Sequence, residues 1–132
     1  MEEHWIFKKG VPVDFFVENG VPKSALIRGD FWYGIKSEDR NQWGLVPDIL
    51  ENFLASVLEC HETLQVIEKI KCLDDKWKWE NDSNDFYLRF SPKSAYLEHS
   101  VDPGIYAELE IDVFRIVVVA WKEFLEMNAQ ST

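Results

Sequence analysis

Hydrophobic and polar residues alternate along several short stretches of the chain, a spacing typical of strands with one buried face. The first stretch, Val13 to Val17, leads into Asn19-Gly20, a dipeptide that favours tight hairpin turns. We expect Pro22 to limit the regularity of the second hairpin strand, which is predicted at Ser24 to Arg28. Another strand is predicted at Phe31 to Ile35.

A helix is predicted from Pro47 onward, because proline suits a first helical turn and no glycine follows for many residues. Its apolar residues form one stripe at helical spacing: Ile49, Leu50, Phe53, Leu54, Val57 and Leu58. Residues 62–73 extend this helix, continue it after a kink, or form a separate strand, and the pattern does not choose among the three.

The third section returns to the spacing of strands. Trp77 and Trp79 are predicted to share one face of a short strand, with Lys76 and Lys78 on the other face. The polar stretch Asn81 to Asp85 is predicted to turn the chain. Further strands are predicted at Phe86 to Phe90, Tyr96 to His99 and Tyr106 to Ile111.

A final helix is predicted with Asp112 as its cap and an apolar stripe running from Phe114 to Leu125. Three consecutive valines make a strand over residues 116–119 the alternative. Together the elements predict one α+β domain over residues 1–132: a mainly antiparallel sheet with two principal helices packed on one face. With 132 residues, 46% of them hydrophobic, the chain buries about two thirds of its surface on folding.

The charge of the chain limits its partners. Twenty-four Asp and Glu against 14 Lys and Arg give a net charge of -10, which argues against nucleic acid and against an anionic membrane surface. A basic protein partner fits this balance. The first ten residues lack the order of a secretory signal, so a cytoplasmic protein is expected. The sequence leaves the oligomeric state open.

Catalytic and cofactor motifs are not recognisable in the sequence. The three histidines, His4, His61 and His99, are far apart, and Cys60 with Cys72 lacks the paired spacing of a zinc site. Cys60 lies in the predicted helix beside its apolar stripe, which favours packing over nucleophilic chemistry. We therefore expect a protein that is not an enzyme and holds no cofactor or metal.

Acidic and aromatic residues gather at two places that suit protein recognition. Carboxylates speed the encounter with a basic partner, and a central aromatic ring supplies a desolvated anchor. Solvated turns and core tryptophans are the alternative interpretation of both places. The first cluster comprises Asp74, Asp75, Trp77, Trp79, Glu80, Asp82 and Asp85, and the second Glu38, Asp39 and Trp43.

In its small size, acidity and sheet-plus-helix pattern, the chain resembles the immunity proteins of bacterial polymorphic-toxin and contact-dependent growth inhibition systems. The segment Gly29 to Ile35 (GDFWYGI) is similar to the Gly-Asp-aromatic signature of one such family. The resemblance implies a cytoplasmic antidote that binds a cognate toxin, a basic nuclease in many cases, and occludes its active site or an adjacent surface. Two alternative hypotheses for the function are an adaptor or structural subunit that acts through homo- or hetero-oligomerisation and a small enzyme whose carboxylate pair belongs to no recognisable motif.

Overall fold

The computed structural model describes residues 13–26, 45–74, 76–82, 85–100 and 106–128. The elements, in chain order, are β1 (Val13–Glu18), β2 (Val21–Leu26), α3 (Val46–Asn52), α4 (Val57–Lys71), β3 (Trp79–Asp82), β4 (Phe86–Phe90), β5 (Ser94–His99), β6 (Tyr106–Glu110) and α5 (Ile111–Asn128). The strand predicted at 31–35, residues 27–28 and the segment 29–35 that carries the family resemblance lie outside the described residues.

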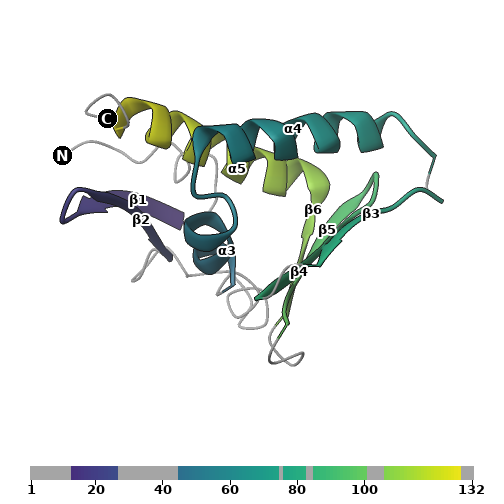
Figure 1. Cartoon of the computed structure of the whole chain (residues 1–132). Helices are drawn as coiled ribbons and strands as arrows, with labels where there is room; N and C mark the ends of the chain where they lie inside the picture. Colours follow the sequence, from purple (N-terminus) through teal and green to yellow (C-terminus); the bar gives the residue numbers. More distant parts are fainter. Residues whose placement is uncertain (1–12, 27–44, 75, 83–84, 101–105, 129–132) are drawn as a thin grey trace, which may run out of the picture.

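The elements form an α+β fold, as predicted, with the strands divided between two antiparallel sheets. β1 and β2 form a hairpin, and β3-β4-β5-β6 form a larger sheet in sequence order. Figure 1 shows α4 and α5 lying side by side, with the larger sheet below one end of the pair and the hairpin below the other. The short helix α3 lies between the hairpin and the sheet.

The hairpin turns at the dipeptide that the sequence singled out. Asn19 and Gly20 both have positive φ, 54° and 78°, which matches a type I′ turn. The expected disruption at Pro22 is wrong, because Pro22 pairs with Val17 inside an unbroken register. Two residues further along, the Ser24 N–H points out of the hairpin and donates to the Glu51 carboxylate of α3 at 2.9 Å. Backbone N–H groups along a strand alternate in direction, so the nitrogen of Pro22 points out of the hairpin like that of Ser24. The missing N–H of Pro22 therefore removes no hydrogen bond between β1 and β2.

The helix predicted from Pro47 is interrupted, and residues 62–73 belong mainly to a second helix. α3 ends at Asn52 and α4 begins at Val57. Ser56 caps α4: its hydroxyl accepts from the Glu59 backbone N–H at 3.1 Å and donates to the Glu59 carboxylate at 3.0 Å. The break changes the phase of the stripe, so Leu58, predicted on the apolar face, is 65% exposed.

The carbonyl of Leu54 lies buried at this break and has no helical partner of its own. The Trp121 indole N–H of α5 donates to it at 2.8 Å, and the Cys60 thiol of α4 donates at 3.6 Å. A buried carbonyl without a partner costs about 1–3 kcal/mol. The two donors therefore tie the break to both long helices.

The predicted strand around Trp77 and Trp79 starts later than expected. β3 begins at Trp79, so Trp77 precedes the strand and does not share a face with it. Asn81 and Asp82, predicted as part of a turn, pair with Leu88 and Tyr87 in the ladder. The cross-strand pairs extend the regular structure into a stretch whose composition alone favours a turn.

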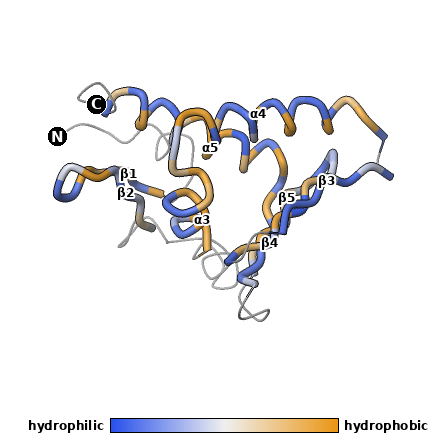
Figure 2. Tube along the Cα trace, in the orientation of Figure 1, coloured by the Kyte–Doolittle hydropathy of each residue, from blue (hydrophilic) through white to orange (hydrophobic). Residues whose placement is uncertain are grey.

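The final helix is confirmed, and it includes the valines for which a strand was the alternative. Val117, Val118 and Trp121 of α5 are fully or almost fully buried. The prediction of Asp112 as the cap is wrong, because the helix begins one residue earlier at Ile111; Asp112 lies in the first turn and forms an ion pair with Lys71 of α4. Figure 2 shows hydrophilic and hydrophobic residues alternating along α4, whereas α5 is more continuously hydrophobic. The core sits below α5, between the larger sheet, α3 and the hairpin.

Candidate functional site

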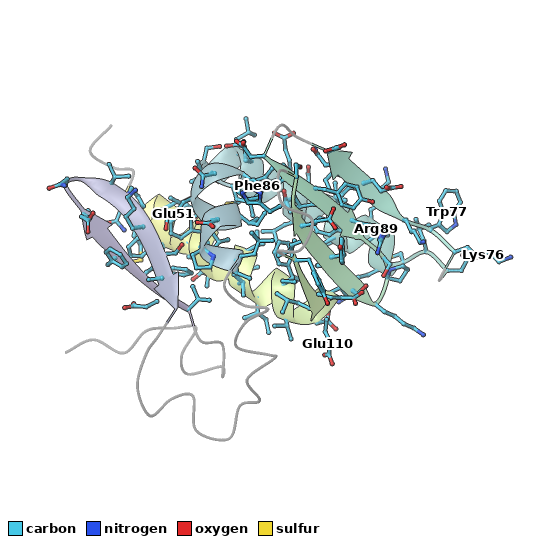
Figure 3. The ribbon with its side chains drawn as sticks, turned by 90° about the horizontal axis from the view of Figure 1, so that it is seen from below. Glu51, Lys76, Trp77, Phe86, Arg89 and Glu110 are labelled. Atoms are coloured by element: carbon cyan, nitrogen blue, oxygen red, sulfur yellow. The ribbon has the colours of Figure 1, made fainter. Side chains whose placement is uncertain are left out.

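The larger sheet has one face against the helices and one face away from them. Alternate residues of β4, β5 and β6 are buried, among them Leu88, Leu97 and Ala107. The side chains between them point to the opposite face, which Figure 3 views from the side away from α4 and α5. We call this surface the tyrosine face and define it as Glu80, Asp82, Tyr87, Arg89, Tyr96, Glu98, Tyr106, Glu108 and Glu110.

Three tyrosines from neighbouring strands form a continuous aromatic row across this face. The ring of Tyr96 lies 6.2 Å from that of Tyr87, edge to face, and 6.0 Å from that of Tyr106, stacked. The Arg89 guanidinium lies 4.7 Å from the centre of the Tyr96 ring, within the range of a cation–π contact. The rings hold one another in place, so the row is a rigid feature of the surface.

Two of the tyrosine hydroxyls donate to carboxylates on the same face. Tyr96 donates to Glu98 at 2.6 Å, and Tyr87 donates to Glu80. The hydrogen bond to Glu98 and partial burial raise the pKa of Tyr96 to about 12. The hydrogen bond to Glu80 likewise raises the pKa of Tyr87. Both phenols therefore stay protonated at neutral pH and keep their carboxylates in fixed positions.

The tyrosine face is strongly acidic. Its strand positions carry the carboxylates of Glu80, Asp82, Glu98, Glu108 and Glu110. Arg89 is the only Lys or Arg among the described strand residues of the larger sheet. Most of the acids lie on β3 and β6, the two edges of the sheet as described, and the tyrosine row runs from β4 across β5 to β6. A surface that combines an aromatic row with neighbouring charged side chains has the composition of a protein-binding patch.

The residues of the first predicted cluster lie on different surfaces of the structure and do not form one site. Glu80 and Asp82 lie on the tyrosine face, whereas Trp79 points the other way and stacks on Phe90 at 4.9 Å. Trp77 is 56% exposed at the end of the segment between α4 and β3.

The other predicted residues are exposed or lie outside the described part of the chain. Asp74 is exposed, and its carboxylate accepts from the Lys76 N–H at 3.0 Å. Asp85 is exposed just before β4. Asp75 of the first cluster, and Glu38, Asp39 and Trp43 of the second, lie outside the described residues.

Sequence reasoning missed Tyr87, Tyr96, Tyr106 and the acids of β5 and β6 as a site. Each alternating stretch revealed its own exposed residues, but those residues become a surface only through the register. In the ladder Tyr96 pairs with Arg89 on one side and with Glu108 on the other. The signal available in the sequence was the repeat of Tyr and Glu at every second position in Tyr96 to Glu98 and Tyr106 to Glu110.

Two observations in the described residues concern metal ligands and the Cys60 thiol. No group of three or more His, Cys, Asp or Glu side chains in the described ranges is placed to hold a metal ion. Burial raises the pKa of the Cys60 thiol to about 12, and Glu59 adds to the rise. That thiol is therefore protonated at neutral pH and acts as a hydrogen-bond donor to Leu54.

Comparisons with known proteins identified no relative of this chain. A scan of protein-family models found no matching family, and searches of curated proteins and of solved structures found no match. Within the described residues, no helix has the length and apolar composition needed to cross a bilayer.

Proposed function

We propose that this chain is a cytoplasmic immunity protein that neutralises a cognate bacterial toxin by binding a basic surface of it through the tyrosine face. The bound chain blocks the toxin's active site or a surface beside it and performs no chemistry of its own. The resemblance in the sequence supports this function, and so does the tyrosine face, which the sequence patterns did not predict.

The observation that carries the proposal is the combination of fixed tyrosines and surrounding carboxylates on one sheet face, which no described helix or strand covers. Tyrosine supplies a large contact area with little loss of side-chain freedom on binding, since its ring has few rotatable bonds. Here the neighbouring rings and the bond from Tyr96 to Glu98 already restrict that freedom. These side chains are therefore already ordered in the free protein, and binding a partner costs little additional side-chain entropy.

The carboxylates of β3 and β6 determine which partners fit. Glu108 and Glu110 lie on the same face of β6, roughly 7 Å apart along the strand, and Glu80 and Asp82 repeat this spacing on β3. A basic nuclease surface is built to bind rows of negative charge, which such an arrangement imitates. These acids also raise the association rate, towards about 10⁸ M⁻¹s⁻¹ at low salt.

The same charge disfavours self-association through this face. Two copies meeting face to face would bring their carboxylates together, and like charges brought close across an interface cost several kcal/mol. A heterologous basic partner suits this surface better than a second copy of the chain.

The test is protection of cells from a toxin. A toxic domain encoded beside this gene is expressed in a bacterial host, alone and with the chain, and survival is counted. We expect the wild type to protect. We expect Glu108→Lys with Glu110→Lys to lose protection, to slow association about tenfold and to flatten its salt dependence.

The matched control is Glu123→Lys with Glu126→Lys on α5, which changes the net charge equally but leaves the tyrosine face untouched. The control should protect like the wild type, with both variants folded by circular dichroism. Failure of the wild-type chain to protect against any neighbouring toxic product would overturn the proposed function. Equal protection by the two double variants would remove the tyrosine face from the interface.

A further inference from the structure

A second candidate binding surface lies on the other side of β3, between that strand and α4. Two hollows open there, of about 490 Å³ and about 320 Å³. Val66 of α4 and Trp79 of β3 line both of them. The hollows therefore adjoin and form one groove, which we call the α4–β3 groove.

Apolar side chains line both hollows of the groove, and its two ends carry opposite charge. Besides Val66 and Trp79, its apolar lining comprises Phe53, Ile70, Leu73 and Trp77. Glu59 and Glu62 line the larger hollow, and Lys69 and Lys78 line the smaller one. Leu73 and Trp77 are 42% and 56% exposed, an unusual degree of exposure for large apolar side chains placed next to each other.

The dimensions of the groove match an extended peptide. Glu62 and Lys69 are seven residues apart on α4, which is about 10 Å along a helix axis. Three to four residues of a strand span that distance. β3 is an edge of the larger sheet as described, paired with β4 alone, and an edge strand can pair with a further strand.

We propose that the α4–β3 groove binds an extended segment of a protein partner, which pairs with β3 as an added strand. Alternate apolar side chains of the segment contact Val66 and Trp79. Its basic end lies at Glu62 and its acidic end lies at Lys69. The inference is independent of the proposed function, because β3 turns Glu80 and Asp82 to the tyrosine face and Trp79 and Asn81 to the groove.

The charges also fix the direction of the segment. Asn81, near the end of β3, lines the Glu59–Glu62 hollow, and Lys78, just before β3, lines the other. A segment antiparallel to β3 therefore begins at the carboxylates and ends at the lysines. Basic residues at its start and acidic residues at its end satisfy both the charges and the favoured antiparallel pairing.

Two peptides of identical composition, acetyl-KKVTVTEE-amide and acetyl-EEVTVTKK-amide, test this direction. Each is titrated into the isotope-labelled chain at low salt, and amide chemical shifts are recorded. We expect the first peptide to perturb β3 and the groove side of α4 and to bind at least tenfold tighter than the second. Glu62→Lys combined with Lys69→Glu, both exposed positions, should abolish that preference, because Glu59 and Lys78 remain and each end of the groove then carries one acid and one base.

The control variant is Lys122→Glu with Glu126→Lys, which reverses an ion pair on α5 without altering the groove or the net charge. It should keep the preference of the wild type. Equal binding of the two peptides would overturn the proposal. Shifts confined to the tyrosine face, no shifts at all, or a preference that the groove variant leaves unchanged would overturn it as well.

Discussion

The two faces of the larger sheet come from the same four strands, β3 to β6, yet they differ in almost every physical respect. On the inner face, Leu88 and Leu97 are fully buried, and Phe90 lies 5.4 Å from Phe114 of α5. On the outer face, the tyrosines remain partly exposed and the carboxylates lie in solvent or bond to them. The period of two along each strand assigns neighbouring residues to opposite faces.

This difference separates the residues that hold the fold together from those that are open to a partner. A buried leucine contributes through burial and close packing, and the cost of truncating it is high because the cavity does not fully collapse. An exposed tyrosine contributes to stability mainly through its cross-strand neighbours, which is a smaller effect. Mutations at adjacent positions should therefore have different consequences.

The largest expected effect is on the inner face. Leu97→Ala should lower the free energy of unfolding by about 3 kcal/mol, since it leaves a cavity in a fully buried site. Tyr96→Ala, one residue away, should lower it by about 1 kcal/mol or less. Urea unfolding of both variants measures the difference. Similar losses at the two positions would mean that the faces are not as distinct as their burial indicates.

A smaller effect should come from the one indole that donates to the helix break. Trp121→Phe removes one of the two donors to the buried Leu54 carbonyl, leaving only the Cys60 thiol, and should cost about 1 kcal/mol beyond the lost packing. Trp79→Phe is the matched substitution, because that half-buried indole packs by stacking on Phe90. The loss for Trp121→Phe in urea unfolding should exceed that for Trp79→Phe by about 1 kcal/mol. Equal losses would show that Cys60 alone satisfies the carbonyl.

The smallest expected effect is a pH dependence on the outer face. The pKa of Tyr96 rises from 10.0 to about 12 on folding. Its contribution to stability is therefore complete below pH 10 and is lost as the pH rises through about 12. Glu98→Gln should bring the titration of Tyr96, followed by tyrosinate absorbance, back towards the unfolded value. Glu108→Gln on the same face should leave it in place, and a titration unmoved by Glu98→Gln would contradict the assigned cause.

The elements that sequence patterns predicted well are those specified by local interactions. Asn19-Gly20 sets the hairpin turn through its backbone preference, and the stripe from Phe114 to Leu125 specifies α5. The break between α3 and α4 had a local signal in Ser56 and Glu59, but the continuing apolar stripe outweighed it. What makes the break tolerable is Trp121, 67 residues away from Leu54, and no local pattern contains that contact.

The candidate site was less predictable than the fold for a related reason. Acids and tryptophans close in sequence suggested one cluster, but β3 sends Trp79 inward and Glu80 outward. The tyrosine face depends on register across all four strands of the larger sheet, which composition does not encode. The same limit applies to the α4–β3 groove, since its lining comes from a helix and a strand that are separate along the chain.

The junction between β6 and α5 has no intervening residue: Glu110 ends the strand and Ile111 begins the helix. The Ile111 N–H still donates to the Lys93 carbonyl at 2.9 Å, so this residue is anchored to the turn between β4 and β5. Inserting a single amino acid here would rotate the helix by about 100° relative to the strand and expose the buried side of α5. Homologous chains of different length should therefore carry their insertions and deletions in the turns and none between β6 and α5.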